Sequence, residues 1–181
     1  FTTADVCRDG RPVGQALAEI SEFLARRWTR QMPLCAFNAP YDLTVLDNAM
    51  RRHLGMRLRL SGPVVDPQLL DFASIDELRP GRWPSPRRRR VRSLVEVCKE
   101  YGVPPPPPGI HDAAQDALGA VRLACALVSR SNVLTEIDIN DLQPLQRRWK
   151  GLRERDFGHP RALVEEAWPM EYAHSRAVYR S

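Results

Sequence analysis

The sequence has no apolar run of the about 18 residues that a membrane-spanning helix requires, and it has no Cys-x-x-Cys pair. Its 4 cysteines are scattered over 181 residues, too sparsely for the disulfide scaffold of a small secreted domain. Aromatic residues make up only 7% of the chain, but hydrophobic residues reach 43%, which excludes wholesale disorder. We therefore expect a cytoplasmic globular protein with reduced thiols and no membrane partner.

The chain carries a modest positive charge of +5, which arginine dominates. One dense group is Arg87–Arg90, and a second lies near the C-terminus at Arg147, Arg148, Lys150, Arg153 and Arg155. Such groups suit a polyanionic partner, because they neutralise phosphates and release counterions. A solvated loop in an arginine-rich protein explains the first group equally well.

Helix-like and strand-like segments alternate, which favours an α/β domain. Apolar spacing predicts strands over 34–37 and 64–67, and helices over 14–28, 42–54, 93–101, 113–129 and 141–157, with a further polar helix at 160–167. We expect a domain over residues 1–130 followed by a helical tail over 131–181. Two strands are few for such a domain, whose sheet normally has about five.

Local signals mark two of these segments. Ser93 with Glu96 three residues later predicts a capping box at a helix start. The run Pro104–Pro108 predicts a stiff spacer that holds the next segment in place. In that next helix, the expected inward face consists of Ala114, Ala117, Leu118, Val121, Ala124, Cys125 and Val128.

Acidic and imidazole residues fall where strands lead into helices, the usual location of active sites in α/β enzymes. Asp42 follows the first predicted strand, and His111 and Asp116 flank the start of the helix over 113–129. Ordinary explanations exist for two of the acids, since Asp42 suits a helix dipole and Asp112 suits an N-cap. Asp116 interrupts a face of small apolar residues, so its carboxylate needs a partner, of which a metal ion is one.

Two segments together resemble motifs of a known family. Residues 37–43 (FNAPYDL) resemble the second motif of the DnaQ-like, or DEDDh, 3′–5′ exonucleases, and residues 111–117 (HDAAQDA) resemble the third. Residues 64–67 (VVDP) and 93–103 resemble the intervening family segments, in the expected order. The resemblance spans roughly residues 1–129 and implies an α/β fold of the ribonuclease H-like type.

The resemblance implies a reaction and its catalytic residues. Family members use two divalent metal ions, Mg²⁺ or Mn²⁺, to hydrolyse the terminal phosphodiester of a single-stranded nucleic acid. Asp116 would be a direct metal ligand, Asp42 would support the second metal, and His111 would be the general base.

The remaining family positions imply supporting roles. Asn38 and Tyr41 would shape the nucleotide pocket, whereas Asp66 and Asp112 would act structurally or support the ligands. The expected partners are 3′ ends of single-stranded DNA or RNA, and a polymerase or a second copy of the chain stays open as a protein partner.

The sequence departs from the family in one respect: no Asp-x-Glu occurs anywhere in its 181 residues. That first motif supplies two direct metal ligands and belongs to an N-terminal region of about three strands. Its absence agrees with the shortage of strands, so we expect a fold that is truncated at its N-terminus and inactive as this chain. The interpretation favoured is a fragment of a complete exonuclease. The alternative is a non-catalytic nucleic-acid-binding or polymerase-associated module that retains a degenerate exonuclease fold.

Overall fold

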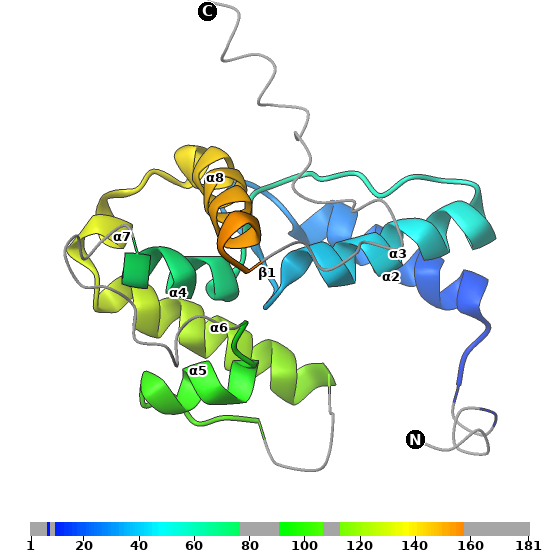
Figure 1. The fold of residues 1–181 in the computed structure, drawn as a ribbon. Coiled ribbons are helices and arrows are strands. Elements are labelled where there is room, and N and C mark those ends of the chain that lie inside the picture. Colours follow the sequence, from blue (N-terminus) through cyan, green and yellow to red (C-terminus); the bar gives the residue numbers. More distant parts are fainter. Residues whose placement is uncertain (1–6, 8–9, 77–90, 107–112, 158–181) are drawn as a thin grey trace, which may run out of the picture.

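The computed structural model describes residue 7 and residues 10–76, 91–106 and 113–157. In these parts the protein is mixed α/β and mostly helical, with a small two-stranded parallel sheet (Figure 1). The elements are α2 (Val13–Arg27), β1 (Leu34–Cys35), α3 (Ala39–Leu54), β2 (Val64–Val65), α4 (Pro67–Asp76), α5 (Leu94–Glu100), α6 (Ala113–Ser129), α7 (Asn132–Glu136) and α8 (Ile139–Phe157). None of these helices is long and apolar enough to cross a membrane.

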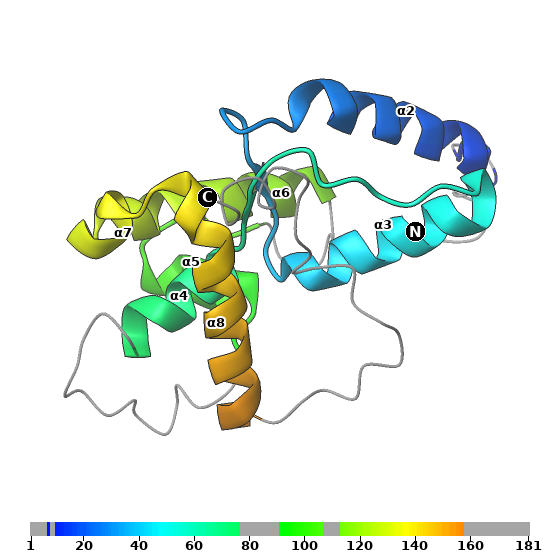
Figure 2. The same cartoon turned by 90° about the horizontal axis from the view of Figure 1, so that it is seen from above.

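The sheet lies between two groups of helices. Helices α2 and α3 run side by side on one side of it, and α4 to α8 lie on the other (Figures 1 and 2). A single cluster of buried side chains joins the groups, with Leu43 from α3, Leu123 from α6 and Trp149 from α8. The described part of the expected helical tail therefore packs into the same core as the preceding residues.

The two strands pair in parallel, with Leu34 opposite Val64 and Cys35 opposite Val65. The Leu34 N–H donates to the Pro63 carbonyl at 3.0 Å. Helix α3 makes the crossover between the strands, as parallel pairing requires. Both strands occur where the sequence predicts them, but each is only two residues long.

The connection from α3 back to β2 is held against the end of α2. Trp28 is buried and donates its indole N–H to the Pro63 carbonyl at 2.8 Å. The chain passes so close that a Cβ at Gly62 would lie 2.5 Å from the Thr29 carbonyl oxygen. Only glycine fits at this crossing.

The structure departs from the sequence predictions at helices α3 and α4. Helix α3 begins at Ala39 and not at Asp42, because Pro40 occupies its first turn, where a missing N–H costs nothing. Asp42 therefore lies inside the first turn. Helix α4 was not predicted from the sequence at all: its Leu69, Leu70 and neighbours are buried on several sides, so no clear helical period marks it.

Helix α6 has the predicted bounds but a different inward face. Its buried residues are Gly119, Ala120, Leu123 and Leu127, whereas Leu118 and Val121, expected inside, are 41% and 45% exposed. The helix thus buries a different side from the predicted one, and Leu118 and Val121 face outward.

Candidate nucleotide-hydrolysis site

The carboxyl ends of β1 and β2 lie at the same edge of the sheet because the strands are parallel. Asn38 and Asp42 follow β1, and Asp66 follows β2 directly. Helix α6, whose first turn contains Asp116, packs against β1. Asp42 and Asp66 therefore follow the two strands at this edge, and Asp116 lies on a helix that packs against β1.

Asp66 is completely buried and holds the edge together. Its Oδ1 accepts the N–H groups of Asn38 and Gln68, both at 2.9 Å, and its Oδ2 accepts the Ala39 N–H at 3.1 Å. Burial raises the pKa of Asp66 to about 6, against the opposing effect of these backbone donors and of Arg153. Both oxygens are used by the backbone, so Asp66 fixes the turn after β1 and starts α4.

Asn38 has a left-handed backbone, with φ 62° and ψ 48°, and it is the only non-glycine residue with positive φ among those described. Asparagine tolerates this region better than most residues. The conformation turns the Asn38 N–H toward Asp66 and lets the chain enter α3 at the next residue. Its half-buried side chain lies at the junction of strand and helix.

The third and fourth residues of α3 face solvent. Tyr41 is 67% exposed, and Asp42 is also exposed. Partial desolvation nevertheless raises the pKa of Asp42, an effect that its own backbone N–H opposes. A neighbouring cation would reverse this shift. Asp116 is half-buried, between exposed residues of the first two turns of α6.

The cysteine of β1 is not a candidate nucleophile. Burial raises the pKa of Cys35 to about 12, with further contributions from Asp66 and from Cys125 on α6. The thiol therefore stays protonated at neutral pH, and thiolate is the form that attacks or binds metal. All four cysteines are free, as expected from the sequence.

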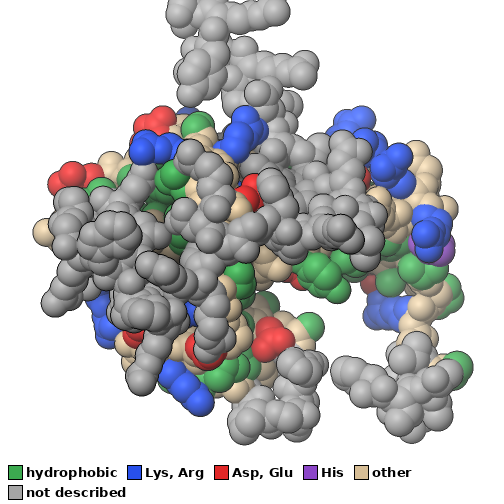
Figure 3. Space-filling view, viewed as in Figure 1, with side chains coloured by type: hydrophobic (Ala, Val, Ile, Leu, Met, Phe, Trp, Pro, Cys, Tyr) green, Lys and Arg blue, Asp and Glu red, His purple; other side chains and the backbone are tan. Residues whose placement is uncertain are grey.

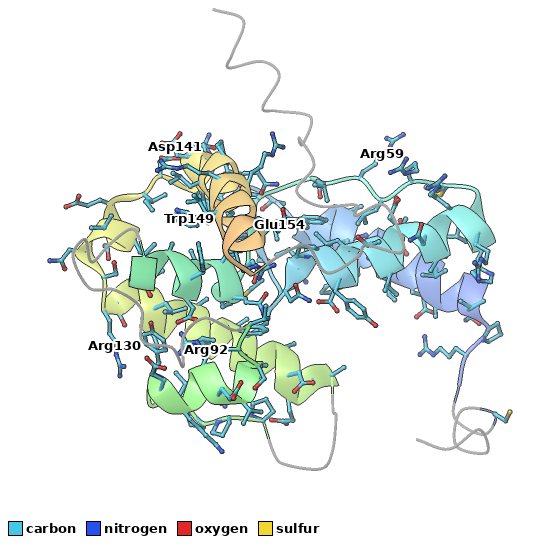
Figure 4. All side chains as sticks on the ribbon, in the orientation of Figure 1. Arg59, Arg92, Arg130, Asp141, Trp149 and Glu154 are labelled. Carbon is cyan, nitrogen blue, oxygen red and sulfur yellow. The ribbon has the colours of Figure 1, made fainter. Side chains whose placement is uncertain are left out.

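No local sequence pattern indicated the contribution of α8 to this edge. The Gln146 side chain accepts the Asp66 N–H and donates to the Val64 carbonyl, both at 2.7 Å, and so occupies the outer edge of β2 as a strand would. Arg153 donates to the Gln68 side chain. Figure 4 shows α8 above α4, with Trp149 between them. These contacts join residues 80 or more positions apart, which no local pattern reveals.

The described residues do not by themselves fit a pair of metal ions. They contain no group of three or more His, Cys, Asp or Glu side chains that could hold a metal. Asp66 is already saturated by backbone donors, which leaves Asp42 and Asp116 as candidate ligands on the described elements. The predicted general base His111 and its neighbour Asp112 lie outside the described residues.

Comparison of the chain with known protein families, with curated proteins and with solved structures finds no match.

Proposed function

We propose that this chain carries part of the catalytic core of a DnaQ-like 3′–5′ exonuclease, which hydrolyses terminal phosphodiesters of single-stranded nucleic acid. The observation that carries the proposal is the parallel pair β1–β2, followed by Asp42 in the first turn of α3 and by Asp66 directly after β2, with β1 packed against the helix that contains Asp116. The order of the motifs along the chain is the second support. Because the described carboxylates do not fit a two-metal site, the complete enzyme needs further acidic ligands.

A further segment that brings those ligands would pair with the edge of β1 that lies opposite β2. Gln146 closes the outer edge of β2, but no strand pairs with the other edge of β1 within the described residues. Helix α6 packs against β1, and its outward stripe contains Leu118 and Val121. A strand added to β1 would cover both features. If it carried Asp-x-Glu, it would extend the sheet toward the ribonuclease H-like form and add metal ligands.

Cleavage assays test the proposal. We expect no release of 3′-terminal nucleotides from labelled single-stranded DNA or RNA by the 181-residue chain, with either Mg²⁺ or Mn²⁺. Joined to the sequence that precedes Phe1 in its gene, the chain should cleave. Asp116→Asn should abolish that activity, and Asp141→Asn, the same change in the first turn of α8, should preserve it. Comparable cleavage by the short chain, or none by any form that contains Asp-x-Glu, would contradict the proposal.

The second candidate is a non-catalytic nucleic-acid-binding or polymerase-associated module, which the absence of a metal-ligand group among the described residues favours. The C-terminal basic group is a weaker binding surface than the sequence predicts. Lys150 is buried and pairs with Glu154, and Arg153 bonds to Gln68. Salt-dependent binding that a chelator leaves unchanged, without cleavage by the longest form, would establish this alternative.

A further inference from the structure

A concentration of arginine lies at the end of α3 and in the segment that follows it. Residues 51–59 contain Arg51, Arg52, Arg57 and Arg59 and no Asp or Glu. All four side chains are exposed. We call these four residues the basic ridge. Figure 3 shows Lys and Arg side chains gathered on this part of the surface, beside a histidine, and Figure 4 labels Arg59 above α3.

The backbone holds Arg57 and Arg59 on one side of their segment. From residue 57 to 61 exposure alternates, with Leu58 and Leu60 buried and the residues between them exposed. This period of two indicates extended backbone, in which alternate residues share a face about 7 Å apart. The Leu58 N–H donates to Asp47 Oδ1 at 2.8 Å, which ties the segment to α3.

The ridge is poorly neutralised. Asp47 is buried and pairs with Arg57 at 3.0 Å. Arg51, Arg52 and Arg59 form no ion pair with a carboxylate in the described ranges 10–76, 91–106 and 113–157. The dipole of α3 accounts for cations in its last turn, but it does not explain Arg57 and Arg59, which lie beyond the helix.

We propose that the basic ridge binds the phosphodiester backbone of the nucleic acid strand whose 3′ end reaches the proposed site. Guanidinium groups suit phosphate oxygens because they donate two parallel hydrogen bonds. Arg52 lies ten residues after Asp42 on the same helix, a rise of about 15 Å. At the rise of about 3.4 Å per nucleotide that a strand has when stacked as in B-form DNA, this distance corresponds to roughly four nucleotides. That the bound polymer is a nucleic acid rests on the proposed function. The charge and geometry of the ridge are independent of that proposal.

The ridge would read phosphates and not bases, so its binding should depend on salt and not on sequence. Each phosphate contact to a single strand contributes about 0.7 to the slope of log affinity against log salt. Removing two contacts should lower the magnitude of the slope by about 1.4. At low salt, a variant that lacks two contacts should bind at least about tenfold more weakly than the parent chain.

The test is fluorescence anisotropy of labelled single-stranded DNA and RNA with the whole 181-residue chain in EDTA, between about 50 and 200 mM KCl. The double variant Arg52→Gln, Arg59→Gln should show the reduced affinity and slope. Arg26→Gln, the same change at an exposed arginine already paired with Glu22, should bind as the parent does. Equal thermal midpoints of the three proteins would show that folding is unchanged.

Three results would each contradict the proposal that the basic ridge binds nucleic acid. The parent chain could bind neither oligonucleotide, the double variant could keep the parent's affinity and slope, or the chain could bind anionic lipid vesicles and not nucleic acid. Because no cleavage is measured, the outcome is separable from that of the nuclease proposal. Loss of binding in the double variant, together with inactivity of every longer form, would support the ridge and count against the exonuclease.

Discussion

Asp66 connects the end of β2 to the starts of α3 and α4 through one buried carboxyl group. Burial raises its pKa from 3.8 to about 6, so the folded protein keeps a proton that the unfolded chain has lost between these values. Over that range folding is linked to proton uptake. The free energy of unfolding therefore receives its full contribution from Asp66 below about pH 4 and loses it as the pH rises through about 6.

We predict that the parent loses stability relative to Asp66→Asn between pH 4 and pH 7. The loss should be about 3 kcal/mol, because each unit of pKa shift corresponds to about 1.4 kcal/mol. Asparagine does not titrate, although its amide would face the Ala39 N–H and lower stability at every pH. Urea unfolding of both proteins across this range measures the difference, in which other titrating groups cancel. Parallel pH profiles would show that Asp66 titrates normally.

The contacts of a single residue can be predicted from sequence only when its partners lie close to it along the chain. The capping box at Ser93 and Glu96 is confirmed, because both partners lie within one helical turn. The contacts of Gln146 were not predicted, since β2 lies 80 or more residues earlier in the chain. Asp66 could be placed after a strand, but its saturation by three backbone donors depends on the left-handed turn at Asn38.

At the scale of elements, the proline run positions α6. Pro106 is buried and meets α6 at Gly119, where an added Cβ would lie 3.2 Å from the Pro106 Cγ and 3.6 Å from Leu94 of α5. The proline ring has little freedom to move away. The sequence predicts a proline spacer that holds the next segment in place. Pro106 makes such a contact, because it packs against α6 at Gly119.

We predict that Gly119→Ala destabilises the protein by about 1 kcal/mol, although alanine is the better helix former. The matched control is Gly151→Ala in α8, where nothing lies within 4 Å of the added Cβ. There the change should raise the free energy of unfolding by about 0.5–1 kcal/mol. Chemical denaturation of both variants provides the comparison. If Gly119→Ala raised the free energy of unfolding as much as Gly151→Ala does, the proline segment would have to shift away from the added methyl group at little cost.

Helix bounds were more predictable than the faces that helices bury. The limits of α6 follow from its apolar spacing, but its buried face is decided by what packs on it: α4, α5, α7 and β1. With Leu118 and Val121 exposed, local periodicity gave the wrong face. The outcome is informative, because an outward apolar stripe is what a missing neighbour would leave.

At the scale of the whole molecule, the candidate site depends on elements distant in sequence. The sequence placed Asp42 and Asp116 near helix starts, and the structure has them in the first turns of α3 and α6. The position of one turn relative to the other is set by the shared core, not by either motif. The participation of α8 followed from no local pattern, since its charged sequence suggested a separate tail.

The cooperativity of the fold can be tested at Trp149, which is 1% exposed and belongs to the same core cluster as Leu43 of α3. We predict that Trp149→Ala costs about 3–5 kcal/mol, because it opens a large cavity in a close-packed core. Phe23→Ala on α2 removes an aromatic ring that is 62% exposed and should change stability by less than about 0.5 kcal/mol.

Hydrogen exchange separates a shared core from two independent units. If α2 and α3 unfold together with α8, Trp149→Ala should lower the protection of their slowest amides by the same free energy as those of α8. Unchanged protection in α2 and α3, with loss confined to α4–α8, would mean that the small sheet joins two separately stable units. The two groups of helices would then be able to move relative to each other, and α3 with Asp42 would hold no fixed position relative to α6 with Asp116.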